Sequence, residues 1–214
     1  MILGIDISHH QGAPDLAAVR SSGRSFVVLK ATEGTGFTDP EFAASRARAH
    51  AAGLLVGHYH FARAGDPRAE SAAFVHAVGG LQPDEFAVLD WEVSAPDPVS
   101  WCATWLTATR DALGVRPLVY MNQSARDRSD WTRVVQGDFG LWLARYDGST
   151  DACASGHWPA LAMKQYDDKG EVPGVAGQVD LDVFYGTEDQ LRAYGRGATP
   201  DDGGPVGPDG PGAG

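Results

Sequence analysis

The chain has 214 residues, of which 43% are hydrophobic and 21% charged, values typical of one soluble globular domain. Its net charge of −11 argues against nucleic-acid binding, which normally leaves a basic footprint, and against attraction to an anionic membrane surface. The sequence contains no run of about 18 apolar residues, as a membrane-spanning helix would need. The opening MILGIDIS lacks the basic and long apolar segments of a signal peptide, so we expect none in this chain.

Short apolar runs rich in Val, Ile, Leu and aromatic residues predict eight strands. In chain order they cover residues 2–8, 25–31, 54–61, 86–93, 117–122, 140–146, 161–166 and 179–186. Ala-rich segments with helical character lie between several of them, at residues 14–23, 39–53, 67–80 and 98–114. In the second of these, Asp39 is the expected N-cap and Gly53 the expected C-terminal stop.

Strands that alternate with helices predict βα units and a parallel sheet, and eight strands favour an α/β fold of the TIM-barrel type. Such a barrel typically uses about 250 residues, whereas about 196 precede the C-terminal tail. We therefore expect a modified TIM-like β/α barrel with helices that are fewer than eight or shorter, especially after the fifth strand. A doubly wound open sheet is the alternative, but the chain has no Gly-rich dinucleotide fingerprint.

The tail, residues 197–214, differs in composition from the rest of the chain. Gly and Pro supply eleven of its eighteen residues, and it has no aromatic residue, Lys or Arg. Such a segment cannot bury enough apolar surface to become ordered, so the composition predicts a flexible linker. We expect residues 1–196 to form the folded domain and the linker to lead to a second module. Cys102 and Cys153 are the two cysteines, and the sequence leaves open whether they form a disulfide.

The fourth predicted strand, FAVLDWEV, carries two carboxylates in an otherwise apolar run. Because side chains of a strand alternate between faces, Asp90 and Glu92 point the same way, and Leu89 and Trp91 point the other way. The apolar face suits the helix layer of a barrel. The two carboxylates therefore point inward at the C-terminal end of the strand, which is where barrel enzymes place their chemistry.

Polar side chains near the same end of the other strands predict a hydrophilic cleft. They are Asp6, Ser8, Lys30, Glu33, His58, His60, Asn122, Arg145, Gln165, Asp180 and Asp182. Two kinds of site suit the crowded carboxylates. One is a metal site, with oxygen ligands or with His9, His10, His58 and His60, although no spacing such as HExxH occurs. The other is acid and base catalysis on a glycosidic bond, for which crowding raises one carboxyl pKa. Aromatic residues that could stack on sugar faces are Tyr59, Tyr120, Trp142, Tyr146 and Tyr166.

Six motifs in order resemble the glycoside hydrolase family 25 lysozymes. They are GIDISHHQG (4–12), KATEG (30–34), GHYHFAR (57–63), VLDWE (88–92), LWLARY (141–146) and QYDDKGEVPGVAGQVDLDVF (165–184). The resemblance covers residues 2 to about 190. It implies an irregular β/α barrel and hydrolysis, without a cofactor or metal, of the β-1,4 bond between N-acetylmuramic acid and N-acetylglucosamine in bacterial peptidoglycan.

The resemblance also implies roles for individual residues. Glu92 corresponds to the general acid and Asp90 to the second carboxylate, as nucleophile or as the group that steers the substrate's acetamido group. Asp6 and Asp180 correspond to the other catalytic-cleft aspartates. The expected substrate-binding residues are Tyr59, Trp142, Gln165 and Asp182. The chain departs from the usual motifs at His10 and Lys164, where relatives commonly carry aromatic residues, and at Asp182, where they more often carry Asn.

Other functions stay open at this point. A chitinase-like or endo-β-N-acetylglucosaminidase barrel also ends a strand with a D-x-E pair, but usually with a longer acidic run than PDEFAVLDWE. A non-catalytic wall-binding module is the non-enzymatic alternative. We expect a monomer, with a wall-binding module beyond the tail that would compensate for the negative charge. The expected setting is the bacterial wall, reached by secretion or, for a phage lysis protein, from the host cytoplasm.

Overall fold

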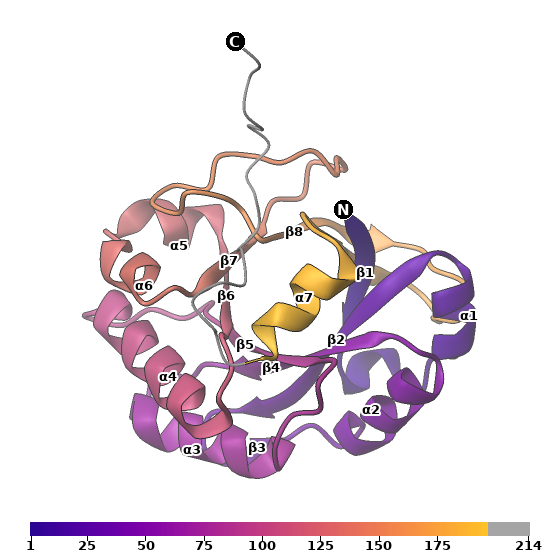
Figure 1. The fold of residues 1–214 in the computed structure, drawn as a ribbon, viewed down its shortest axis with the longest axis horizontal. Coiled ribbons are helices and arrows are strands. Elements are labelled where there is room, and N and C mark those ends of the chain that lie inside the picture. Colours follow the sequence, from indigo (N-terminus) through magenta and orange to yellow (C-terminus); the bar gives the residue numbers. More distant parts are fainter. Residues whose placement is uncertain (197–214) are drawn as a thin grey trace.

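A computed structural model describes residues 1–196 as one closed barrel surrounded by helices (Figure 1). The predicted linker, residues 197–214, lies outside the described residues. The strands are β1 (Ile2–Ile7), β2 (Arg24–Glu33), β3 (Phe37–Thr38), β4 (Leu55–Phe61), β5 (Glu85–Asp90), β6 (Leu118–Asn122), β7 (Gly140–Ala144), β8 (Met163–Gly170) and β9 (Val179–Phe184). None of the helices in residues 1–196 has the length and apolar character that crossing a membrane requires.

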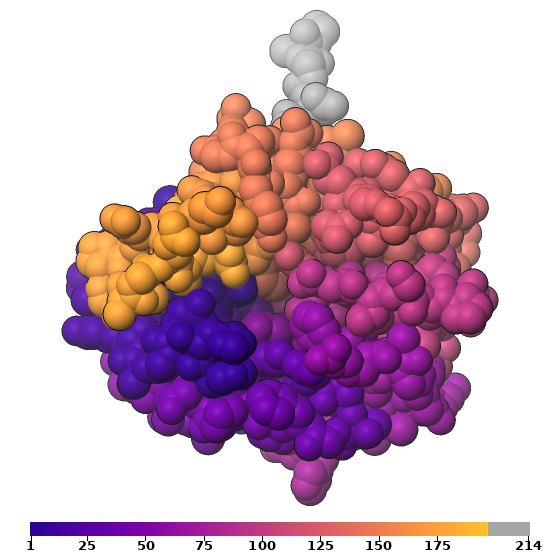
Figure 2. Space-filling model, turned by 180° about the vertical axis from the view of Figure 1, so that it is seen from behind, coloured from indigo at the N-terminus to yellow at the C-terminus, as the bar shows by residue number. Residues whose placement is uncertain are grey.

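The sheet order is β1-β9-β8-β7-β6-β5-β4-β2-β3, and an additional pairing of β1 with β2 closes the barrel. All eight predicted strands are present, and β3 is a short addition that pairs with the end of β2. Closure brings the two ends of the folded chain together. Figure 2 shows the first residues in indigo beside the last described ones in yellow, as the pairing of β1 with β9 requires.

The prediction of an entirely parallel sheet is wrong at the last strand. β9 runs antiparallel to both of its neighbours, β1 and β8, while the other neighbouring barrel strands are parallel. The physical reason is the short connection, residues 171–178, between β8 and β9. A parallel crossover needs a dozen or more residues, whereas antiparallel strands can be joined by a short loop.

Helices are fewer and shorter on the second half of the barrel, as the residue count predicted. They are α1 (Leu16–Ser21), α2 (Phe42–Ala51), α3 (Pro67–Val78), α4 (Pro98–Leu113), α5 (Gln123–Arg128), α6 (Thr132–Gln136) and α7 (Glu188–Tyr194). A single turn of 3-10 helix, His9–Gln11, follows β1. No helix lies between β7 and β8 or between β8 and β9. Gly114 ends α4 in the left-handed conformation, as a C-terminal glycine allows.

One predicted helix boundary needs correction. The N-cap of α2 is Glu41 and not Asp39, and Glu41 makes no side-chain capping bond. Asp39 instead accepts hydrogen bonds from the backbone N–H groups of Glu41 (2.9 Å) and His9 (3.0 Å). Its carboxylate therefore connects the loop after β1 to the segment just before α2, two segments that lie 30 residues apart in the sequence.

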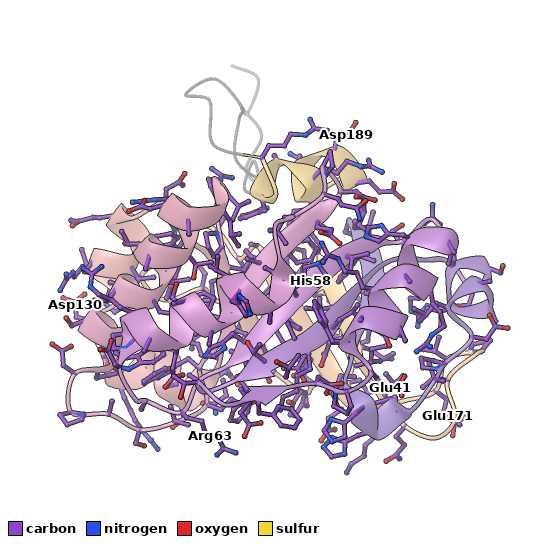
Figure 3. All side chains as sticks on the ribbon, turned by 90° about the horizontal axis from the view of Figure 1, so that it is seen from below. Glu41, His58, Arg63, Asp130, Glu171 and Asp189 are labelled. Atoms are coloured by element: carbon purple, nitrogen blue, oxygen red, sulfur yellow. The ribbon has the colours of Figure 1, made fainter. Side chains whose placement is uncertain are left out.

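Two apolar layers flank the barrel wall. The interior cluster includes Phe26, Phe86 and Trp142, and the outer cluster lies between the strands and the helices. Leu191 and Tyr194 of α7 belong to the interior cluster, so this helix closes the N-terminal end of the barrel. Seen from the side in Figure 3, Asp189 of α7 lies at the opposite end from Arg63, which follows β4. The open end is therefore the C-terminal end of the strands.

Candidate active site

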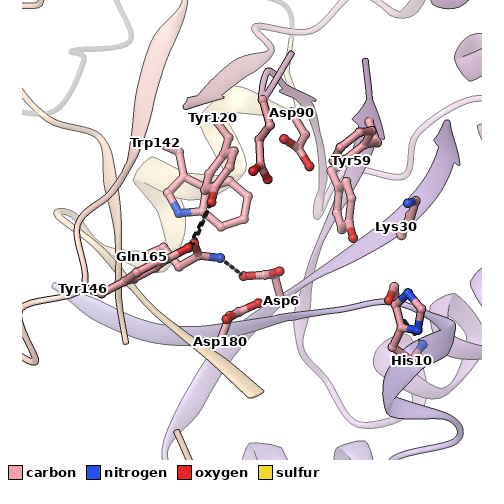
Figure 4. Close-up of a pocket in the computed structure, with 13 residues that line it drawn as sticks. Asp6, His10, Lys30, Tyr59, Asp90, Tyr120, Trp142, Tyr146, Gln165 and Asp180 are labelled. Atoms are coloured by element: carbon pink, nitrogen blue, oxygen red, sulfur yellow. Dashed lines mark hydrogen bonds between the residues drawn. The ribbon is translucent and has the colours of Figure 1, made fainter. Parts of the chain in front are cut away.

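The cleft at the open end has a volume of about 280 Å³ (Figure 4). Polar and aromatic side chains from all eight barrel strands or the residues just after them form its lining. They are Asp6, Ser8, His10, Lys30, Tyr59, Phe61, Asp90, Glu92, Tyr120, Trp142, Tyr146, Gln165 and Asp180. β5 contributes its last residue and the one two positions beyond, and β9 contributes Asp180 near its start because it runs the other way.

Asp90 and Glu92 both line the cleft, as strand alternation predicted. β5 ends at Asp90, earlier than expected, but the backbone N–H of Trp91 still donates to the carbonyl of Tyr120 at 2.9 Å. Trp91 points away from the cleft and packs against Trp101 of α4, with ring centroids 5.0 Å apart. Asp90 is buried at 7% exposure, while Glu92 is exposed. A buried carboxyl therefore lies beside one that a ligand can reach.

Gln165 of β8 organises the floor of the cleft. Its Nε2 donates to Asp6 Oδ2 at 2.6 Å. Its Oε1 accepts from the hydroxyls of Tyr120 and Tyr146, each at 2.8 Å. Two donors on the oxygen and an acceptor at the nitrogen orient the amide in one way. Gln165 thereby connects strands at opposite ends of the chain, and one oxygen of Asp6 is held by a neutral donor.

Asp182 is completely buried and is not among the residues that line the cleft. Its Oδ1 accepts a hydrogen bond from Trp142 Nε1 at 3.0 Å, and the neighbouring charge of Asp6 adds to the effect of burial in raising the pKa of Asp182. The structure thus places Asp182 behind the site, in contact with two lining residues, and not at its surface.

The cleft carboxyls retain protons more strongly than ordinary carboxyls do. Burial, reinforced by neighbouring acids, raises the pKa of Asp6 to about 8 and that of Asp180 to about 6. Burial also raises the pKa values of Asp90 and Glu92, and the positive charge of Lys30 opposes this rise at both. Two adjacent desolvated carboxyls do not both ionise readily. The cleft can therefore keep a transferable proton near neutral pH.

The prediction that His58 and His60 face the cleft is wrong, because Tyr59 occupies that face of β4. His60 is buried, with Nδ1 2.8 Å from Thr32 Oγ1 and Nε2 2.9 Å from Glu70 Oε2. His58 lies on the same outer face, 3.1 Å from a carboxylate oxygen of Glu85. Histidines that have carboxylate partners beneath the helices can be buried without a ligand.

The histidines proposed as metal ligands are therefore not brought together. His9 Nδ1 lies 2.7 Å from Asp39, and of these histidines only His10 lines the cleft. Within residues 1–196, no group of three or more His, Cys, Asp or Glu side chains is arranged to hold a metal ion. Cys102 and Cys153 are free cysteines, the first buried and the second half-buried.

Three other polar residues of the predicted cleft have roles outside it. Asn122 caps α5 by accepting from the backbone N–H of Ala125 at 2.9 Å. Arg145 pairs with Asp147 at 2.7 Å. Glu33 is not a lining residue but accepts a hydrogen bond from Lys30 Nζ at 2.6 Å. Position at a strand end is therefore insufficient to place a side chain in the cleft.

Phe61 is a lining residue that sequence reasoning missed, and Tyr120 and Tyr146 were noted only as nearby aromatic residues. A usable signal existed for Phe61. It lies two positions after Tyr59 on the same strand, and alternation places both on one face. The tyrosines could not be ranked, because only the contact with Gln165 distinguishes them from core aromatic residues.

A β/α barrel with paired carboxyls at a strand's C-terminal end and aromatic side chains around them is the architecture of a glycoside hydrolase. Comparison of the sequence identifies the particular family. The family model described as "Glycosyl hydrolases family 25" matches residues 5–175. The chain belongs to this family.

The chain is similar to several named proteins. It is 32% identical over 209 residues to Lysozyme M1 of Streptomyces globisporus, covering 90% of this chain and 70% of that protein. It is 34% identical over 187 residues to the autolytic lysozyme of Clostridium acetobutylicum, covering 85% of this chain and 55% of that protein, or about half its length. Among solved structures, the muramidase from Trichobolus zukalii superposes with a TM-score of 0.79 at 30% identity, covering 92% of this chain and 100% of that one.

Proposed function

We propose that this protein is a lysozyme that hydrolyses the β-1,4 bond between N-acetylmuramic acid and N-acetylglucosamine in bacterial peptidoglycan. The observation that carries the proposal is the pair of carboxyls after β5, with buried Asp90 beside exposed Glu92, in a barrel of glycosyl hydrolases family 25. The names of the similar proteins, lysozyme and muramidase, support the same substrate.

Glu92 is the proposed general acid. Its carboxyl is exposed to the cleft, so it can reach the oxygen of a bound glycosidic bond, and partial desolvation raises its pKa. Proton transfer from Glu92 to that oxygen lets the bond to the anomeric carbon break as positive charge develops on the sugar. The product sugar then leaves with the proton, and Glu92 can accept another from the attacking water.

Asp90 is the proposed second carboxylate, which stabilises the charge that develops on the sugar. Its Oδ1 is buried and has no hydrogen-bond partner within residues 1–196. This oxygen can form a bond with the anomeric carbon, or it can accept a hydrogen bond from the acetamido N–H while the acetamido oxygen attacks that carbon. Both routes need Asp90 ionised while Glu92 holds the proton that the pair retains.

The remaining residues are proposed to position the substrate. Asp6 and Asp180 lie on the cleft floor near the pair, where their oxygens can accept hydrogen bonds from sugar hydroxyls. Tyr59 and Trp142 offer ring surfaces to the sugar, and Gln165 orients the floor through Asp6. For Asp182, which the cleft does not reach, we propose a positioning role through Asp6 and Trp142.

Product analysis tests the proposal. Purified peptidoglycan is digested, the fragments are reduced and then identified by mass spectrometry. We expect N-acetylmuramic acid at the new reducing ends, and a rate about 10³-fold lower for Glu92→Gln. The matched control is Glu171→Gln, which removes an exposed carboxylate that does not line the cleft and should leave the rate unchanged. N-acetylglucosamine at the new ends, or full activity of Glu92→Gln, would overturn the proposal.

We further propose that residues 1–196 form the catalytic domain, since all eight barrel strands in this range contribute to the lining of the cleft. A monomeric state stays a prediction of the sequence. The proposed place of action is the bacterial cell wall, reached by secretion or by phage lysis. The linker role of residues 197–214 and a wall-binding module beyond them stay predictions of the sequence.

A further inference from the structure

The two sides of the cleft differ in chemistry. In Figure 4, Trp142 and Tyr146 lie on one side of the carboxyls, while Lys30 and His10 lie on the other. The Lys30 side continues outward from the cleft as a surface made by residues of β2, β3 and β4 and the loop after β4. We call the surface formed by Lys30, Glu33, Phe37, Phe61 and Arg63 the cationic ledge.

Cation–π contacts hold the ledge together. Lys30 Nζ lies 4.9 Å from the ring centroid of Phe61 and 5.6 Å from that of Phe37. The guanidinium carbon of Arg63 lies 5.2 Å from the same Phe61 ring. Phe61 thus contacts both cations, and contacts of this kind fix the positions of charged side chains that would otherwise be flexible.

The ledge carries one net positive charge. Glu33 accepts from Lys30 at 2.6 Å and from Arg63 Nε at 2.7 Å, and Arg63 Nη2 also donates to it. One carboxylate therefore neutralises one of two cations. Among the described residues, Nη1 of Arg63 has no acceptor, so it is free to donate to a ligand. The Arg63 side chain is 60% exposed and points outward from the edge of the molecule (Figure 3).

The surroundings make this charge distinctive. The whole chain carries a net charge of −11, and the cleft floor is lined by carboxyls. Near Asp180, the carboxylate of Asp168 adds further negative charge, which contributes to the raised pKa of Asp180. An anionic group on a bound substrate is repelled at the Asp180 side and attracted at the ledge. The ledge therefore orients an acidic ligand in one direction.

We propose that the cationic ledge binds a carboxylate of the peptide stem that the muramyl sugar of peptidoglycan carries, with Arg63 as the residue that contacts it. This inference rests on the proposed function and names the part of the substrate recognised outside the sugar subsites. Arg63 Nη1 donates to the carboxylate, while the Phe37 ring, which is 39% exposed, packs against the peptide beside it. A stem whose carboxylate is neutralised loses the hydrogen bond from Arg63 but keeps the packing against Phe37.

The test uses soluble peptidoglycan fragments freed of wall polymers, in two forms: one with free stem carboxylates and one with these carboxylates amidated. The measured quantity is the ratio of kcat/KM for the acidic form to that for the amidated form. We expect Arg63→Gln to lower this ratio by about two- to fivefold, the effect of one partly exposed ion pair. Arg63→Glu should lower it further, and Glu33→Gln, which frees a second cation, should raise it. The differences should shrink at high salt.

Arg192→Gln is the matched control, because Arg192 is also paired with carboxylates, Glu188 and Asp189, but lies on α7 at the closed end. It should leave the ratio unchanged. A third substrate, amidated fragments that retain anionic phosphate polymers, separates the two sources of negative charge. The inference would be overturned if the ratio were the same for the wild type and for all Arg63 and Glu33 variants. It would also be overturned if the Arg63 variants differed from the wild type only on the fragments that carry phosphate polymers. Failure of the wild type to cleave either form would instead overturn the proposed function.

Discussion

Lys30 should set the pH range in which the enzyme works. It lines the cleft, and its positive charge lowers the pKa values of both Asp90 and Glu92 against the rise caused by burial. In Lys30→Met that opposing charge is gone, so both carboxyl pKa values rise. The bell-shaped dependence of kcat/KM on pH reports the pKa values of the acid and the base in the free enzyme. Both limbs of the profile should therefore move to higher pH.

The size of the shift follows from electrostatics. Two unit charges in an effective dielectric constant of about 20 interact by about 4 kcal/mol at roughly 4 Å and about 2 kcal/mol at roughly 8 Å, and 2 kcal/mol corresponds to about 1.5 pH units. Glu33, 2.6 Å from the Lys30 ammonium, and solvent in the open cleft reduce this contribution. We therefore expect a displacement of roughly 0.5–1 pH unit.

The assay is the pH profile of kcat/KM on the amidated fragments, so that carboxylate binding at the ledge does not contribute. Lys30→Arg, which keeps the charge, is the control and should retain the wild-type profile. A profile of Lys30→Met that is unchanged, or displaced toward lower pH, would refute the electrostatic reasoning. Equal displacement in both variants would show that side-chain shape, and not charge, is responsible.

Two further predictions concern residues where the chain departs from the usual family motifs. Lys164 is 1% exposed and donates to Asp147 (2.7 Å) and to two backbone carbonyls in residues 149–151, just after Tyr146. Lys164→Met should loosen this loop, raise KM with little change in kcat, and lower Tm by about 2–4 °C for each kcal/mol lost. Burial raises the pKa of Asp182 far above its usual value, so the folded protein holds this proton more tightly than the unfolded chain does. The free energy of unfolding therefore falls as pH rises above the ordinary carboxyl pKa. Asp182→Asn should therefore increase Tm above about pH 6 but not near pH 3, as thermal scans across pH would show; a lower Tm at every pH would contradict this.

Much of the site could be predicted because strand alternation constrains side-chain direction. The rule placed Asp90, Glu92 and Trp91 correctly from sequence, with Glu92 just past the end of β5. It also placed Gln165 in the cleft, and by the same rule its neighbour Lys164 lies on the opposite face of β8. Alternation needs only local information, which a single strand contains.

The same rule failed for β4, because alternation does not say which face is inward. The pattern of two histidines around Tyr59 resembled a polar cleft face, yet the histidines face outward. Their burial depends on Glu70 and Glu85, which lie on other elements. The direction of β9 was missed for a related reason. The direction depends on the length of the loop between β8 and β9, which is too short for a parallel crossover. The parallel sheet was predicted from the helices between other strands, without regard to the length of this last connection.

The protein contains two classes of buried carboxyl, and their surroundings explain the difference between them. Outside the barrel, burial alone would raise the pKa of Glu85, but the neighbouring His58 and the hydrogen bonds that Arg46 donates to both carboxylate oxygens lower it below its ordinary value of 4.5. Such a carboxylate stays ionised in the folded state and contributes stability above that value, which is lost as pH falls. A carboxyl of this class is matched to cations and does no chemistry.

At the cleft and directly behind it, the donors are mostly neutral. Asp6 receives its hydrogen bond from the Gln165 amide, and Trp142 supplies the indole N–H to Asp182. Neutral donors hold a carboxyl in place without forcing it to ionise, so burial keeps the pKa values of Asp6 and its neighbours high. Full pairing with arginine would remove the proton that Glu92 must deliver. Lys30 of the cleft is itself partly neutralised by Glu33, which leaves the acid pair poised between its protonation states.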